Sequence, residues 1–336
     1  MGGSARGEGS PGTFGNDDPV RRLADAVTES AGGGFLLSRD EYDAAVAEVG
    51  ALRGRPLFLP YLSSGFGRGA RVQLADGRWV IDFALGIGVH FFGHGDPDLR
   101  RVAVDAARAD TAMQGNLQMG LELPALLRLL VKNAGGRIAH GWIANSGAEA
   151  NEIALKIIRQ RKQPAAEIIA FRGGFHGRTT TMAEITDRPE YRRGQPSREV
   201  VHYLPFYDRR DPASADRARN DLREILRSRP GRIAGFVLEL VQGETGFRTA
   251  PREFFLPLLE ECRRAGVATW VDEVQTFGRT GELFAFRKLD LADLVDVVTV
   301  GKLLHCAATL FVPDLRPDPG LVSGTFAGST VGLALG

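Results

Sequence analysis

Residues 268–281 read Ala-Thr-Trp-Val-Asp-Glu-Val-Gln-Thr-Phe-Gly-Arg-Thr-Gly, and residues 297–302 read Val-Val-Thr-Val-Gly-Lys. Both contain the short, β-branched apolar runs that are typical of buried strands, and each brings a polar residue to its carboxyl end. These residues are Asp272 and Lys302. In an open α/β sheet, ligands lie outside the carboxyl ends of the strands. A carboxylate and a lysine meeting there can hold a cationic ring nitrogen and a carbonyl, the two groups of pyridoxal phosphate (PLP) that a protein must bind.

The composition is that of an ordinary globular protein and argues against several function classes. The 336 residues are 43% hydrophobic and 25% charged, and the net charge of +1 argues against a nucleic-acid or anionic-membrane surface. The sequence has no apolar run long enough to span a membrane and no apolar export signal at its N-terminus. Its two cysteines, Cys262 and Cys306, have no metal-like spacing. We therefore expect a cytoplasmic protein with no metal, nucleic-acid or membrane partner.

From residue 97 onward, apolar runs alternate with amphipathic segments. This alternation predicts an α/β fold, a mainly parallel sheet with helices on both faces. Strands are predicted at 137–143, 167–171, 233–240, 268–274, 296–301 and 308–311. Helices are predicted at 99–109, 122–133, 148–160, 213–227 and 252–265.

The first part of the chain has a different pattern. Residues 1–18 are rich in Gly, Ser and Pro, which predicts a disordered tail. Helices are predicted at 18–27 and 38–52, the second opened by a capping box of Ser38 and Glu41. A hairpin is predicted between 71–74 and 79–83. The glycine-rich loop at 83–95 lacks the strand and helix context of a dinucleotide site.

Residues 145–152, Asn-Ser-Gly-Ala-Glu-Ala-Asn-Glu, join a predicted strand to a predicted helix. Ser146 can cap this helix, and Glu149 stands where a capping box needs it. A well-started amphipathic helix is one interpretation. An anion site is the other, because a helix start has free N–H groups and Gly147 allows a close approach. These residues alone leave both interpretations open.

Three motifs resemble those of class III aminotransferases, the PLP-dependent family of the acetylornithine, ornithine and 4-aminobutyrate aminotransferases. They are Val-Asp-Glu-Val-Gln-Thr-Phe-Gly-Arg-Thr-Gly at 271–281, Phe-His-Gly-Arg-Thr at 175–179 and Glu-Leu-Val-Gln-Gly-Glu at 239–244. The likeness begins near residue 57. It implies the aspartate-aminotransferase-like fold, PLP fold type I, with a small N-terminal segment at 19–95 and a PLP-binding large domain at 96–336. We expect the family's C-terminal small domain to be absent, because these 336 residues contain no counterpart of it.

The resemblance implies a role for each matching residue. Lys302 is implied to bind the cofactor's aldehyde and to move a proton between carbon atoms, and Asp272 to keep the pyridine nitrogen protonated. The other implied cofactor-binding residues are Ser146, Gly147 and Ala148 at the phosphate, and Phe175, His176, Glu239, Val274 and Gln275 around the ring. Thr325 is implied to bind the phosphate of the neighbouring subunit, which makes the expected enzyme a homodimer with shared active sites.

Two further positions are implied to contact the substrate. Arg178 is implied to grip a substrate carboxylate, for which a planar guanidinium is suited. Glu244 matches a glutamate that, in relatives, pairs with a C-terminal arginine and switches between substrates. That arginine has no counterpart among the 336 residues, which weakens the switching role.

The activity that the resemblance implies is transamination. The expected donor is an amino acid that gives up its ω-amine, and the expected acceptor is a 2-oxo acid such as 2-oxoglutarate. Two alternatives stay open. One is another PLP reaction on the same fold, catalysed by an aminomutase or a racemase. The other is a truncated, non-catalytic remnant that binds PLP without turnover.

Overall fold

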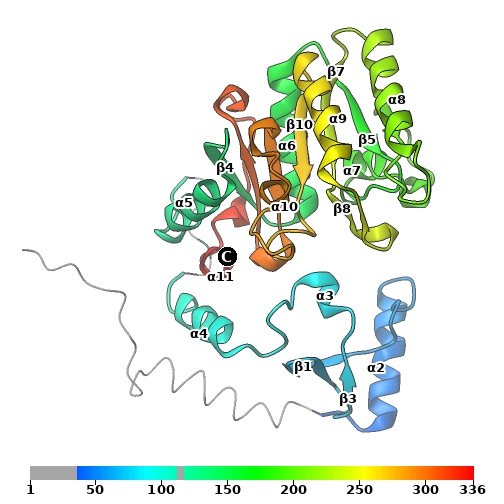
Figure 1. Cartoon of the computed structure of the whole chain (residues 1–336). Coiled ribbons are helices and arrows are strands. Elements are labelled where there is room, and N and C mark those ends of the chain that lie inside the picture. The colour runs from blue at the N-terminus through cyan, green and yellow to red at the C-terminus, as the bar shows by residue number, and fades with distance from the viewer. Residues whose placement is uncertain (1–35, 111, 113–116) are drawn as a thin grey trace, which may run out of the picture. The chain divides into compact units, whose positions relative to one another are not determined.

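The structure, a computed structural model, describes residues 36–110, 112 and 117–336 (Figure 1). The predicted tail at 1–18 and helix at 18–27 lie outside the described residues. The chain divides into two compact units. Among the described residues, the first contains residues 36–85 and His90–Ala109, and the second contains Gly86–Val89, residues 110 and 112, and residues 117–336. The short helix α3 (Leu85–Gly88) lies where the chain passes from one to the other.

The described part of the first unit contains a small antiparallel sheet and two helices. The sheet has the order β1 (Ser63–Arg68), β2 (Arg71–Leu74) and β3 (Trp79–Ile81), and the helices are α2 (Arg39–Leu52) and α4 (Pro97–Ala106). The predicted hairpin is confirmed, since Gln73 pairs with Trp79 across a turn in which Gly77 has a φ of 84°. The predicted capping box of α2 is confirmed too: Glu41 N–H donates to Ser38 Oγ, and Ser38 N–H donates to Glu41 Oε2.

The second unit is built on a seven-stranded sheet with the order β4-β12-β11-β10-β7-β5-β6. Its strands are β4 (His140–Ala144), β5 (Glu167–Phe171), β6 (Val201–Leu204), β7 (Ile233–Leu238), β10 (Ala268–Asp272), β11 (Val297–Val300) and β12 (Ala307–Phe311). Strand β12 runs antiparallel to both of its neighbours, and the other pairs of adjacent strands are parallel. The prediction of a mainly parallel sheet is therefore confirmed.

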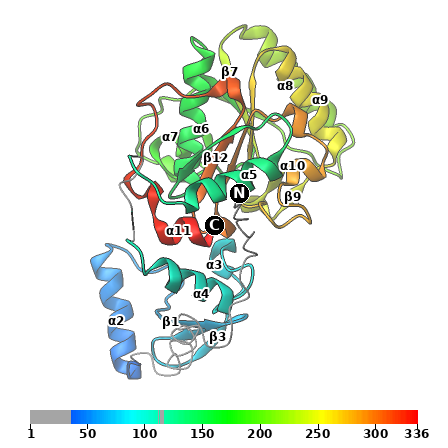
Figure 2. The ribbon, with the colours of Figure 1, turned by 90° about the vertical axis from the view of Figure 1, so that its left-hand side faces the viewer.

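Helices cover both faces of this sheet, with α6 and α7 on one side and α8 and α9 on the other (Figures 1 and 2). The helices of this unit are α5 (Glu122–Ala134), α6 (Gly147–Lys162), α7 (Thr180–Ile185), α8 (Ser214–Ser228), α9 (Arg252–Arg264), α10 (Ala285–Lys288) and α11 (Thr330–Leu335). Its short 3-10 helices are η1 (Pro189–Arg192), η2 (Gly243–Thr245), η3 (Ala292–Leu294), η4 (Lys302–Leu304), η5 (Pro313–Leu315) and η6 (Thr325–Gly328). A two-stranded ribbon, β8 (Val241–Gln242) with β9 (Arg248–Thr249), completes it.

The sheet is the centre of the hydrophobic core. Every residue of β5, β7, β10, β11 and β12 is buried, as expected of central strands that have helices on both faces. Trp270 and Phe236, on neighbouring strands, are fully buried. Among the described residues, no helix is both long and apolar enough to cross a membrane.

Several predicted strands end earlier in the structure. The strand predicted at 268–274 ends at Asp272, and the one predicted at 233–240 ends at Leu238. In both cases the chain leaves the sheet at an acidic residue, Asp272 or Glu239, whose side chain accepts hydrogen bonds from loop N–H groups instead. These early ends place two buried carboxylates at one edge of the sheet.

Candidate active site

Asp272 lies at the carboxyl end of β10 and is 4% exposed. Its Oδ2 atom is 2.9 Å from His176 Nδ1 and 2.8 Å from Asn151 Nδ2. Its Oδ1 atom accepts from the N–H group of Val274 at 3.1 Å. Because a carboxylate can only accept, His176 must carry its proton on Nδ1 to make this bond. The carboxylate is thus held by three donors from three different segments.

Lys302 follows the neighbouring strand. Strands β10 and β11 are parallel, with Asp272 opposite Thr299, so Lys302 leaves the sheet at the edge where Asp272 ends its strand. The predicted arrangement of Asp272 and Lys302 at neighbouring strand ends is confirmed. Lys302 has a φ of 50°, a strained conformation for a residue with a side chain. Burial lowers the pKa of Lys302, and the nearby carboxylates of Asp272 and Glu239 offset this shift only in part. A lowered pKa favours the neutral amine, which is the nucleophilic form.

Glu239 links the end of β7 to the loop that carries Phe175. One carboxylate oxygen accepts from the Phe175 N–H at 2.8 Å and the other from the Gly243 N–H at 3.2 Å. Burial raises the pKa of Glu239 to about 7; His176 opposes the shift and the charge of Asp272 adds to it. Glu239 therefore positions the Phe175 backbone in a cluster that also contains Lys302.

The sequence motifs do not point to Asn151 or Thr299, and both residues belong to this site. Asn151 comes from α6 and is 1% exposed; besides Asp272, its Nδ2 atom donates to the His176 carbonyl at 2.7 Å. Its Oδ1 atom accepts from Thr299 Oγ1 at 2.6 Å, and Thr299 Oγ1 accepts from Trp270 Nε1 at 3.2 Å. The available signal was polarity: each residue interrupts an otherwise apolar face or run.

The start of α6 lies against the turn after β10. Ser146 caps the helix, its Oγ atom accepting from the Glu149 N–H at 3.2 Å. The predicted capping box is only half formed, because the Glu149 carboxylate accepts from the Asn145 N–H at 2.8 Å instead. A Cβ atom on Gly147 would lie 2.7 Å from Val274 Cγ1, so this position has no room for a side chain. Ala148 is the next residue of the first turn, where N–H groups lack helical partners.

Arg178, predicted to bind substrate, is exposed and stacks on an aromatic ring. Its guanidinium carbon is 4.2 Å from the centroid of Tyr191 and 5.8 Å from that of Phe175. The Phe175 and Tyr191 rings meet edge to face at 6.1 Å. The guanidinium thus lies over the Tyr191 ring in a cation–π contact, and the exposed side chain is able to meet a ligand. The sequence motifs do not point to Tyr191, which lies in η1.

Three predicted site residues lie farther from this network of hydrogen bonds. Gln275 is half-buried beside Gly243, where a Cβ atom would lie 3.3 Å from its Cγ. Glu244 lies in η2, and its carbonyl accepts from Arg188 at 3.3 Å. Thr325 is exposed at the start of η6. Its assignment to a neighbouring subunit stays a prediction.

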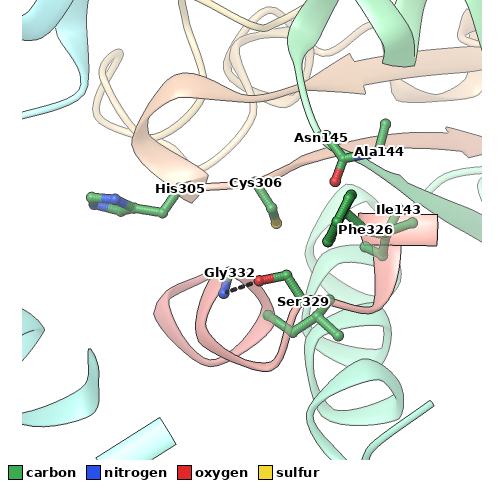
Figure 3. A pocket seen from close by; sticks show the side chains of 10 residues that line it. Ile143, Ala144, Asn145, His305, Cys306, Phe326, Ser329 and Gly332 are labelled. Atoms are coloured by element: carbon green, nitrogen blue, oxygen red, sulfur yellow. Dashed lines mark hydrogen bonds between the residues drawn. The ribbon is translucent and has the colours of Figure 1, made fainter. Parts of the chain in front are cut away.

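A small cavity beside the end of β4 is not part of this cluster (Figure 3). It has a volume of about 120 Å³ and is lined by Asn145, Cys306, Phe326 and Ser329 among others. Ligand sites for small molecules are generally about 300 Å³ or larger. Burial raises the pKa of the Cys306 thiol to about 12, so this residue stays protonated and unreactive. Among the described residues, no group of three or more His, Cys, Asp or Glu side chains is placed to hold a metal ion.

Comparison with known proteins identifies the fold and family. The class III aminotransferase family model matches residues 60–312. A probable mitochondrial acetylornithine aminotransferase of Schizosaccharomyces pombe is 31% identical over 288 residues, covering 80% of this chain and 62% of the relative. A probable 4-aminobutyrate aminotransferase of Bacillus subtilis is 32% identical over 292 residues, with coverages of 80% and 65%. The chain thus spans less than two thirds of the length of these relatives.

A solved structure supports the same assignment of the fold. It is an amine transaminase from an uncultivated Pseudomonas species in a PLP-bound form, with a TM-score of 0.74 at 22% identity, covering 82% of this chain and 68% of that one. The predicted aspartate-aminotransferase-like fold, PLP fold type I, is confirmed. Since the family model covers most of the sequence, this chain belongs to the class III aminotransferases.

Proposed function

We propose that this chain binds PLP at the carboxyl ends of β10 and β11 and transfers an amino group from an amino acid to a 2-oxo acid. The family's cofactor is PLP. The observation that carries the proposal is the placement of Asp272 and Lys302. They stand at the ends of adjacent parallel strands, one carboxylate held by three donors and one lysine with a lowered pKa.

The residues present fit this cofactor. Asp272 offers a buried carboxylate for a cationic ring nitrogen, and Lys302 offers an amine for an aldehyde. Gly147, where Val274 excludes a Cβ atom, brings the backbone at the start of α6 close to the turn after β10. A helix start with exposed N–H groups suits a phosphate. Ser146, Gly147 and Ala148 would hold that phosphate, with Phe175, Val274 and Gln275 around the ring and Thr325 of a neighbouring subunit completing the site.

When bound, PLP supplies an electron sink for the bonds at the substrate's amine-bearing carbon. The rest of the chemistry belongs to side chains of this chain. Asp272 stabilises a proton on the ring nitrogen, because an opposite charge at close range favours the cation. Because the pKa of Lys302 is lowered, its amine is neutral more often than that of an ordinary lysine. Its Nζ atom would accept a proton from the substrate carbon and return it to a different carbon atom. Glu239 and His176 hold the Phe175 loop and the Asp272 carboxylate in place.

The substrate class follows from Arg178 and from the relatives' names. A stacked guanidinium presents a fork that matches a carboxylate, so we assign it the carboxylate of a donor or of a 2-oxo acid such as 2-oxoglutarate. Named relatives act on acetylornithine and 4-aminobutyrate, which favours a donor that reacts at an ω-amine. We also assign Glu244 to the substrate side of the site, because its charge acts on Lys302. We further propose a homodimer in a reducing compartment such as the cytoplasm.

A donor screen tests this proposal. The purified chain is saturated with PLP, and the visible spectrum is followed while single amino donors are added, with 2-oxoglutarate supplied afterwards. Transamination predicts a reversible spectral change in two stages and production of glutamate. A spectrum that responds to no donor would favour the non-catalytic remnant, and interconversion of a donor without consumption of the 2-oxo acid would favour a mutase or racemase.

A further inference from the structure

The strongest unassigned feature is a chain of buried hydrogen bonds that ends on Asp272. It begins at Trp270 Nε1, passes through Thr299 Oγ1 to Asn151 Oδ1, and continues from Asn151 Nδ2 to Asp272 Oδ2. The bonds are 3.2, 2.6 and 2.8 Å long. Each of the four side chains is at most 4% exposed. Water therefore has little access to replace any of these bonds.

The direction of every proton in this chain is fixed. An indole N–H can only donate, so Thr299 Oγ1 accepts from Trp270 and its own proton is left for Asn151. Asn151 must then turn its oxygen toward Thr299 and its NH₂ group toward Asp272. The His176 carbonyl, 2.7 Å from the same NH₂ group, requires that orientation independently. The opposite orientation of the amide would place its oxygen against two acceptors.

We propose that Trp270, Thr299 and Asn151 form a directional relay that positions the Asp272 carboxylate for the pyridine nitrogen of PLP. This inference rests on the proposed function, and none of the three touches the reacting atoms in it. Oδ2 is occupied by two donors, Asn151 and His176, and Oδ1 by the Val274 N–H alone. Since a carboxylate oxygen has two lone pairs, Oδ1 keeps one acceptor position for the ring nitrogen. Fixing Oδ2 thereby fixes where Oδ1 points.

The neighbouring strand supplies a matched control. Thr309 of β12 pairs with Thr299 of β11 in register, and both are fully buried. Thr309 Oγ1 donates to the Ala150 carbonyl at 2.6 Å, one residue before Asn151 in α6. Each threonine therefore makes a short bond to the same turn of α6. Only the one at position 299 is connected to Asp272.

The test compares Thr299→Val, Thr299→Ser and Thr309→Val, each saturated with PLP that carries an isotopic label at the ring nitrogen. Valine keeps the shape of threonine and removes the hydroxyl, whereas serine keeps the hydroxyl. The measurements are the NMR chemical shift of the ring nitrogen, the dissociation constant of PLP and the melting temperature of the apoprotein. The shift reports protonation of the ring and would not respond to a loss of packing alone.

The relay predicts that Thr299→Val moves the NMR signal of the ring nitrogen toward the value of an unprotonated ring. It also predicts that PLP binds about tenfold more weakly, a loss similar to that caused by removing an outer residue that orients a ligand. Thr299→Ser retains the hydroxyl, so its dissociation constant for PLP should stay within about twofold of the wild-type value. Thr309→Val should lower the melting temperature and leave the ring-nitrogen signal unchanged.

If Thr299→Val does not fold, Asn151→Ala takes its place, since alanine suits a helix and the change removes the NH₂ group through which the relay reaches Asp272. A wild-type ring-nitrogen signal and wild-type PLP affinity in whichever variant folds would overturn the relay. So would an equal signal change in Thr309→Val. A wild-type chain that binds no PLP would overturn the proposed function instead, and the two failures are thereby distinguished.

Discussion

The Nδ1 atom of His176 lies 2.9 Å from Oδ2 of Asp272, and both side chains are almost completely buried. His176 comes from the loop after β5 and Asp272 from the end of β10, so this bond ties together two strands that β7 separates. The same loop carries Phe175, whose backbone is held by Glu239 at the end of β7. The three adjacent strands thus fix one loop over the sheet edge through two buried carboxylates.

Asp272→Asn should impair the chemistry more than it impairs folding. Both oxygens of Asp272 face donors, so an amide there must point an NH₂ group at one of them. The variant also leaves a buried ring cation without its partner, a change worth roughly 3–5 kcal/mol. We expect the rate of the first half-reaction to fall by about 10²–10³-fold. Single-turnover rates measure this, with Asp216→Asn on the surface of α8 as control, and a rate within about tenfold of wild type would contradict the pyridinium role.

Lys302 should be the residue that bonds to PLP. Burial lowers its pKa, so attachment should proceed at a lower pH than for an ordinary lysine. Reduction with borohydride traps the bonded lysine, and peptide mass mapping then identifies it. We expect the label on Lys302, its loss in Lys302→Ala, and no change in Lys132→Ala, which alters an exposed position of α5. A label found mainly on Lys132, Lys156, Lys162 or Lys288 would refute the assignment.

The central strands and the pair of Asp272 and Lys302 could be predicted because their signals are local. Each strand is a short apolar run, and each of these two residues ends such a run. Strand β6 was missed because Val201–Leu204, at the edge of the sheet, mixes His and Tyr with apolar residues. Helix α7 was missed because six residues are too few for helical periodicity to be visible.

The partners of Asp272 could not be predicted in the same way. Thr299 and Asn151 are 148 positions apart, and their bond exists only because α6 crosses the sheet above β11. Polarity inside an apolar pattern could indicate that each residue needs a partner, but not which one. The sequence indicates even less about Tyr191, since its contact with Arg178 depends on the path of the chain after α7. Sequence motifs thus indicated the groups expected to contact the cofactor, and the structure added the groups that orient them.

Glu239 should make the stability of the apoprotein fall as pH rises from about 4.5 to 7. Its pKa is raised from 4.5 to about 7 in the folded chain, so within that interval the folded state binds more protons than the unfolded state. Stability then decreases with pH by at most about 1.4 kcal/mol for each unit, and the contribution is fully present only below about 4.5. Urea unfolding of wild type and Glu239→Gln measures the difference, because Gln cannot titrate.

Glu273 also has a pKa raised to about 7 by burial, so wild type retains a second sloping contribution that the Glu239→Gln variant shares. The difference between the two curves isolates Glu239. Glu260→Gln, on the exposed side of α9, serves as control and should leave the slope unchanged. Parallel curves for wild type and Glu239→Gln across this interval would contradict the raised pKa.

Arg178→Lys should weaken the binding of substrates that carry a carboxylate and leave the binding of simple amines unchanged. Lysine is a point charge that cannot present two parallel N–H donors. Hydrogen bonds to charged groups contribute roughly 1.5–3 kcal/mol, so KM for the carboxylate-bearing substrate should rise about 10–100-fold. The measurement compares kcat and KM for an amino acid and for its decarboxylated analogue. An equal loss of kcat/KM for both substrates would indicate a structural role for Arg178.

Tyr191 should strengthen the binding of the same carboxylate-bearing substrates by orienting Arg178. Its ring centroid lies 4.2 Å from the guanidinium carbon, close enough for a cation–π contact that holds the guanidinium plane in one orientation. Such contacts at exposed sites are worth about 0.5–1 kcal/mol, so Tyr191→Leu should raise KM for the carboxylate-bearing substrate about 2–5-fold and leave kcat unchanged. Tyr191→Phe retains the ring and should behave as wild type.

The double variant tests whether Tyr191 acts through Arg178. If it does, Tyr191→Leu should cause no further rise in KM when Arg178 is already replaced by lysine. Steady-state kinetics of the four combinations checks this, and additive losses in the double variant would show that Tyr191 acts by another route.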